Sequence, residues 1–142
     1  MRIPTEEDIN VFNSLDERVA VEHFLGKSAE QAEKLFGENG LLYQEDLMWM
    51  GPMAFAFYLQ AAANYVCGSQ SEGDLSFVDS VIRVIDFRSD EPQIRLAFEP
   101  MGRIVAHVVD NFDRFTIDPE VGQQVLARYR GVQKWLSAQI NQ

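Results

Sequence analysis

Residues 47–71 form a stretch of twenty-five residues without a charged side chain, which limits the possible folds of this chain more than any other feature. Such a stretch is either buried in a protein core or inserted in a membrane. A membrane span needs about 20 consecutive apolar residues, but a Gly-Pro pair interrupts this stretch and Gln60 and Asn64 lie within it. Its flanks are acidic, whereas Lys and Arg usually flank an inserted helix. We therefore expect a buried core helix over about 52–67.

The rest of the chain has the composition of a domain that can surround such a helix. The 142 residues are 46% hydrophobic and 24% charged, which is typical of one folded domain with its own core. Apolar side chains recur at helical spacing nearly throughout, and little supports strands. We expect an all-α fold, with residues 1–142 forming a single-domain bundle of roughly seven helices around the central apolar helix. The expected helices are a short one opening at Thr5, then 16–25, 29–36, 52–67, 75–87, 93–98, 100–115 and 119–139.

Local signals mark several of these helices. Ser28 and Gln31 form a capping box, and Asp118-Pro119 is an N-cap followed by proline at the first helical position. Glycines at 37 and 40 predict the end of the third helix, and 41–50 is predicted as a loop with one helical turn. In the short first helix, Ile9 and Phe12 are expected on one side. The last helix has the clearest apolar stripe, which consists of Val121, Val125, Tyr129, Val132, Leu136 and Ile140.

The charge balance excludes several classes of partner. The chain has 12 Lys and Arg against 22 Asp and Glu, a net charge of -10. A protein of this charge repels DNA, RNA and anionic lipid, so we expect neither a nucleic-acid nor a membrane partner, and a basic protein is the natural complement. Residues 1–71 hold 4 basic and 11 acidic residues and residues 72–142 hold 8 and 11, so the negative net charge is mainly N-terminal.

The sequence contains no pattern that predicts a cofactor or a metal. Gly37 and Gly40 lack the strand and the Lys-Ser/Thr of a phosphate-binding loop. His23 and His107 are far apart in the sequence, and zinc needs three or four converging ligands. Cys67 lies near a predicted helix end without a basic neighbour, so we expect an inert, buried thiol. A lone cysteine, together with an acidic N-terminus that lacks a signal peptide, favours the cytoplasm.

Residues 43–53 combine aromatic, acidic and methionine side chains beside the Gly-Pro pair. One interpretation is that the large apolar residues of this segment pack under the helix that follows. The other is an exposed aromatic anchor surrounded by carboxylates, which suits recognition of a basic protein. The candidate partner-binding residues are Tyr43, Glu45, Asp46 and Trp49, together with Glu38.

Two blocks of sequence resemble a family of small, mostly helical bacterial proteins that is known only as a domain of unknown function. The first block is His23-Phe24-Leu25-Gly26-Lys27-Ser28, and the second runs from Tyr43 through Glu45-Asp46 and Trp49 to Gly51-Pro52 and Ala54-Phe55. The similarity covers about half of the chain. It implies a bacterial origin and a helical fold, and because the family has no established activity it implies nothing about catalysis.

These observations favour a non-enzymatic, acidic protein-binding module. An immunity-type inhibitor of a basic toxin is one form that such a module takes, an association based on size and charge. The alternative is a helical enzyme that uses Glu45 or Asp46 as acid or base in a cleft between helices; it predicts a pocket with two converging carboxylates. A third interpretation is a homodimer formed through the helix over 121–140.

Overall fold

Helix α4 (Pro52–Cys67) occupies the middle of the fold. Pro52 stands at its first helical position, where its missing N–H removes no helical hydrogen bond, and Gly68 follows its end. Eleven of its sixteen residues are buried, and it packs against α3 and α6. The central helix predicted over 52–67 is therefore confirmed at both ends.

The computed structural model describes residues 1–141, and all of the regular structure within them is helical. The other α-helices are α1 (Glu6–Ile9), α2 (Leu15–Phe24), α3 (Ala29–Trp49), α5 (Leu75–Arg88), α6 (Phe98–Asp110) and α7 (Pro119–Ile140). Three short 3-10 helices are η1 (Ser69–Ser71), η2 (Ile94–Ala97) and η3 (Phe112–Arg114). The predicted all-α single domain of roughly seven helices is confirmed. No helix of residues 1–141 is both long and apolar enough to span a bilayer.

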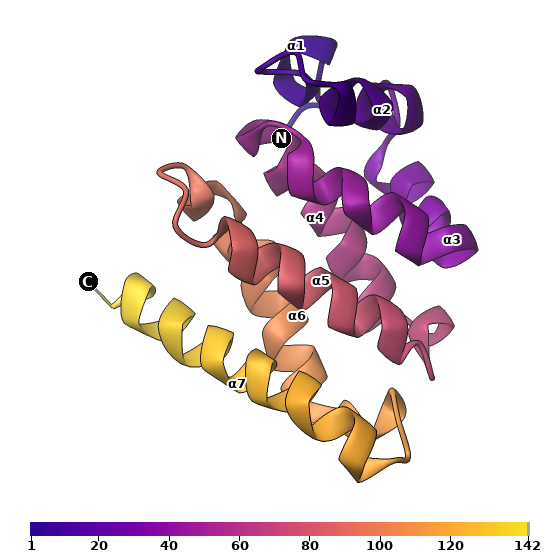
Figure 1. Ribbon diagram of the computed structural model, residues 1–142, viewed down its shortest axis with the longest axis vertical. Coiled ribbons are helices and arrows are strands. Elements are labelled where there is room, and N and C mark those ends of the chain that lie inside the picture. Colours follow the sequence, from indigo (N-terminus) through magenta and orange to yellow (C-terminus); the bar gives the residue numbers. More distant parts are fainter. Residues whose placement is uncertain (142) are drawn as a thin grey trace.

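The helices form two layers closed at one end. In Figure 1, α3, α5 and α7 follow one another down the longest axis, α4 and α6 lie behind them, and α1 with α2 covers the upper end. Two buried tyrosines join neighbouring elements. The hydroxyl of Tyr58 donates to the backbone oxygens of Phe24 and Lys27, and the hydroxyl of Tyr129 donates to that of Val78.

The third helix is much longer than the sequence predicts. The helix expected to end at Phe36 continues as α3 to Trp49, with a kink at Asn39, so the predicted loop over 41–50 is wrong. The Asn39 side chain accepts a hydrogen bond from the Leu42 N–H, which caps the second half of the helix. Gly40 lies directly against the Phe77 ring of α5. Packing against α5 therefore outweighs the cost of two helical glycines, which is about 1 kcal/mol each.

Three smaller predictions also need correction. Phe12 does not share a side with Ile9: α1 ends at Ile9, which is buried, and Phe12 is exposed on the connection to α2. The middle of the α7 stripe is buried, but Val121 and Ile140 at its two ends are exposed. The helix expected over 100–115 divides into α6 and η3, and the short helix near residue 95 is a 3-10 helix.

Candidate functional site

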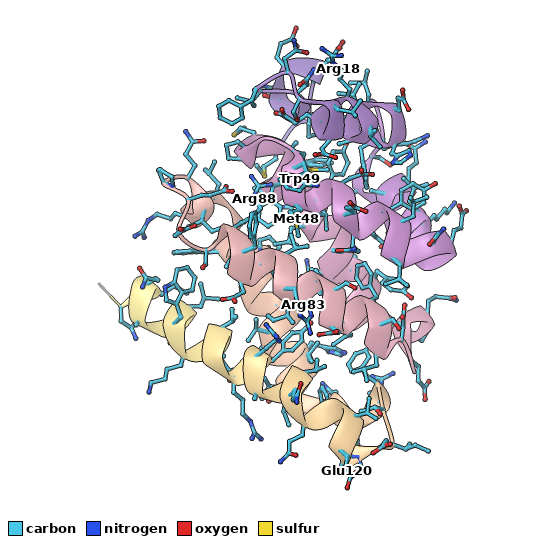
Figure 2. The ribbon with its side chains drawn as sticks, viewed as in Figure 1. Arg18, Met48, Trp49, Arg83, Arg88 and Glu120 are labelled. Carbon is cyan, nitrogen blue, oxygen red and sulfur yellow. The ribbon has the colours of Figure 1, made fainter. Side chains whose placement is uncertain are left out.

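An apolar cleft of about 520 Å³ lies where the ends of α3 and α5 meet the connection between α1 and α2. Four short segments line it, namely 11–12, 48–52, 87–88 and 91–93. Figure 2 shows Met48, Trp49 and Arg88 close together at this place, while Arg18 and Glu120 lie at opposite ends of the molecule. A cleft of this size and apolar lining is typical of a binding site.

Aromatic side chains form its most exposed walls. Trp49 is 40% exposed and its ring meets that of Phe87, which is 58% exposed, edge to face with centroids 6.3 Å apart. Phe12, which also lines the cleft, is 84% exposed. Exposed aromatic side chains gathered around a concavity are unusual on a monomer surface, and Trp is the residue most enriched at interface hot spots.

Arg88 fixes the floor of the cleft. Its guanidinium Nη1 donates to the backbone oxygens of Leu47 and Met50, at 2.8 and 2.6 Å. Nε and Nη2 donate to the carboxylate of Glu91, and the guanidinium lies 4.3 Å from the centroid of the Phe55 ring. Arg88 thus caps the C-terminal carbonyls of α3 and joins them to α5. Its charge is fully engaged within the chain and does not attract an acidic ligand.

The connection that carries Phe12 is held in place from both sides. The Glu17 carboxylate accepts hydrogen bonds from the backbone N–H groups of Phe12 and Ser14. Burial acts to raise the pKa of Glu17, but these hydrogen bonds outweigh it and lower the pKa overall. On the other side, the Gly51 N–H donates to the Ile9 oxygen and attaches α1 to the start of α4. The backbone that carries Phe12 is therefore fixed in place.

Negative charge predominates around the cleft, although the exposed Arg18, whose guanidinium donates to Asn13 Oδ1 beside Phe12, is a cation that opposes it. Helices α3 and α5 both end there, and a helix C-terminus carries partial negative charge. Glu45 is exposed one turn before Trp49, on the same face of α3, and Asp90 is exposed beside Glu91. Arg88 offsets only part of this charge because it is buried and bound to Glu91. A cationic group next to an apolar one therefore fits this place best.

The structure separates the five residues predicted to bind a partner. Trp49 lines the cleft, and Glu45 is on its approach. Glu38 is exposed near the kink of α3 and belongs to a different, more polar hollow. Tyr43 and Asp46 instead face α2.

Asp46 forms a buried pair with His23. Its Oδ2 lies 2.6 Å from His23 Nδ1, and its side chain is only 6% exposed. The Tyr43 ring meets the His23 ring edge to face at 5.1 Å. Burial raises the pKa of Asp46 above its ordinary value, against the lowering effect of His23. Asp46 holds α2 on α3, and as a buried side chain it cannot serve as the exposed carboxylate that the sequence predicts.

Sequence reasoning missed Phe12, Phe87 and Arg88. A signal for Phe87 exists: Asp79, Arg83 and Phe87 follow one another at intervals of four, so a large aromatic residue continues the polar stripe of α5. No comparable signal exists for Phe12, because its exposure depends on where α1 ends. Arg88 resembles any basic residue in a last helical turn.

The remaining candidate chemistry is sparse within residues 1–141. No group of three or more His, Cys, Asp and Glu side chains lies close enough to hold a metal ion. Cys67 is half-buried and burial raises the pKa of its thiol, which disfavours the reactive thiolate. No protein family, no curated protein and no solved structure matches this chain.

Proposed function

We propose that this protein is a non-enzymatic binding module that captures a basic protein partner in the cleft between the ends of α3 and α5. The single observation that carries the proposal is the preformed cleft with Trp49, Phe87 and Phe12 exposed around it. Large aromatic side chains in a concave site supply most of the binding energy of typical interfaces. Because the fold holds the backbone of these residues in place and the Trp49 and Phe87 rings contact each other, little further ordering of the backbone opposes association.

The charge of the chain supports a basic partner. The net charge of -10 and the exposed carboxylates of Glu45 and Asp90 favour a positively charged surface and accelerate the encounter with it. An immunity-type inhibitor that covers a basic toxin in the cytoplasm fits this description. The same chemistry serves any basic protein that presents an apolar side chain.

The experiment is site-specific photo-cross-linking in the organism that produces the protein. A photoreactive phenylalanine analogue replaces Phe12 at the cleft, and the matched control places it at Ile117, which is also exposed but does not line the cleft. We expect a specific, basic cross-linked protein from position 12 and none from position 117. Recovery of the same products from both positions, or of no basic protein from position 12, contradicts the proposal.

Charge reversal provides the second arm. Glu45→Lys combined with Asp90→Lys changes two exposed carboxylates on the approach to the cleft and leaves the buried Asp46 intact. We expect the yield at position 12 to fall several-fold, and to fall likewise when the ionic strength is raised. A yield that is unchanged by both treatments argues against a basic partner.

The enzymatic alternative predicts two converging carboxylates in a pocket, and within residues 1–141 the cleft does not contain such a pair. Glu45 and Asp46 are adjacent on α3, so they point in directions about 100° apart, and neither lines the cleft. The carboxylate that does line it, Glu91, is bound to Arg88. A hydrolytic or transferase activity that is lost in Glu45→Gln would revive this alternative.

A further inference from the structure

The backbone along the cleft is already largely hydrogen-bonded within the chain. Pro52 and Pro92, two of the lining residues, have no backbone N–H to offer. The internal bonds are Phe12 N–H to Glu17, Gly51 N–H to Ile9 O, Phe55 N–H to Gly51 O, Glu91 N–H to Arg88 O, and Arg88 Nη1 to Leu47 O and Met50 O. The cleft therefore binds through side chains and provides few partners for the backbone of a ligand.

The scarcity of free backbone hydrogen-bonding groups along the cleft favours a bound helix over a bound extended peptide. An extended peptide that enters an apolar site leaves its own N–H and C=O groups unpaired, at a cost of about 1–3 kcal/mol for each buried group. Extended peptides normally avoid this cost by joining a sheet edge, and residues 1–141 contain no strand. A helix satisfies its backbone internally and presents apolar side chains at i, i+3, i+4 and i+7.

We propose that the cleft binds a basic amphipathic α-helix of the partner, an inference that rests on the proposed function. The apolar face of that helix inserts a large side chain between Trp49, Phe87 and Phe12. Lys and Arg beside this face meet the carboxylates of Glu45 and Asp90 and the negative ends of α3 and α5. The charge that surrounds the cleft, with Arg88 neutralised by Glu91, specifies a basic helix over an acidic one.

The basic helix of this chain itself is not available as the occupant. Helix α7 carries Arg128, Arg130 and Lys134, but Val125, Tyr129, Val132 and Leu136 of its apolar stripe are buried in its own fold. A second copy therefore has no free apolar helix face there to insert. The bound helix comes from a different protein.

The test uses three synthetic peptides of about 18 residues, a length at which a helix is stable enough to compare. The first has Leu at i, i+3, i+4 and i+7 and Lys on its remaining face. The second has the same sequence except that one central Leu is replaced by Pro. The third has the same sequence with Glu in place of every Lys. The protein is Trp135→Phe, which leaves Trp49 as the single tryptophan, so that its fluorescence reports on the cleft.

We expect the first peptide to bind and to shift the Trp49 emission. The proline and glutamate peptides should each bind at least about tenfold more weakly. Phe12→Ser and Phe87→Ser should each weaken the binding of the first peptide by about tenfold, whereas Ile117→Ser, an exposed position away from the cleft, should change its affinity less than about twofold. Circular dichroism checks that all three variants remain folded.

Several results overturn the helical mode. They are equal binding of the proline peptide, equal binding of the glutamate peptide, no effect of Phe12→Ser and Phe87→Ser, absence of binding by the first peptide, and self-association of the protein through the cleft. A basic partner cross-linked at position 12 together with any of these leaves the proposed function in place and removes only the helix. Failure of the cross-linking as well removes both.

Discussion

Asp46 has a protonation behaviour that follows from its burial beside His23. Its pKa is raised, so between the ordinary value of 3.8 and that raised value the folded chain holds a proton that the unfolded chain has released. The contribution of Asp46 to the unfolding free energy is therefore largest at low pH and falls as pH rises through this window.

We predict that Asp46→Asn removes this fall. Measured by urea denaturation between about pH 3.5 and pH 6, the unfolding free energy of the wild type minus that of the variant should decrease as pH rises. Glu17→Gln is the control with the opposite sign, because the lowered pKa of Glu17 gives a stabilisation that is present above pH 4.5 and lost below it. A difference that is flat with pH for Asp46→Asn would show that its carboxyl has an ordinary pKa.

The pairing of Asp46 with His23 is an example of a contact between side chains that could not be predicted from the sequence. The two residues are separated by 23 positions and belong to different helices. Both look like ordinary surface residues until α2 is placed on α3. Trp49 could be singled out because its type and its acidic neighbours suffice to predict a role in recognition.

At the scale of elements, close approach of the backbone at Gly51 joins α1 to α4. A Cβ at this position would clash with the backbone oxygen of Asp8 and lie 2.5 Å from Val11 Cγ2. Its φ of -58° is ordinary for any residue, so the contact rather than the backbone conformation requires glycine.

We predict that Gly51→Ala lowers the unfolding free energy by about 1–3 kcal/mol and weakens ligand binding, because α1 and the Phe12 wall must move. Gly131→Ala in α7 is the matched control. Nothing lies near its Cβ, so it should raise the unfolding free energy by up to about 1 kcal/mol. Urea midpoints and peptide affinities check both. Equal midpoints for the two variants would contradict the contact at Gly51.

The elements that sequence reasoning predicted well are those whose signals are local. The capping box at Ser28, the proline at the start of α4 and the N-cap at Asp118 all lie where the helices begin. Helix α3 was predicted too short because its continuation past Gly37 and Gly40 depends on the close contact with Phe77, 37 positions beyond Gly40. Glycine propensity alone indicates a stop.

At the scale of the whole molecule, the chain uses its apolar stripes internally. The middle of α7 packs on α5 and α6, and the exposed remainder, Val121 and Ile140, stands at its opposite ends. We predict that the protein alone has the mass of one chain when measured by light scattering at micromolar concentration. A dimer that Val121→Ser and Ile140→Ser abolish would support the homodimer instead.

The overall architecture could be predicted from the sequence because an uncharged stretch as long as residues 47–71 must be buried by the rest of the chain. The helical periodicity of the sequence on both sides of this stretch predicts the amphipathic helices that bury it. The cleft was not accessible, because its walls come from four segments that only the packing of α1, α3 and α5 brings together. The proposed basic partner is inferred from the net charge of the chain, and the proposed place of binding is inferred from the cleft.

The stability of the end of α3 depends on the buried Arg88, which donates hydrogen bonds to its last carbonyls. Phe12 and Phe87 are exposed and are not part of the core. Exchanges at these two positions should therefore change the surface that the cleft presents while the melting temperature stays nearly the same.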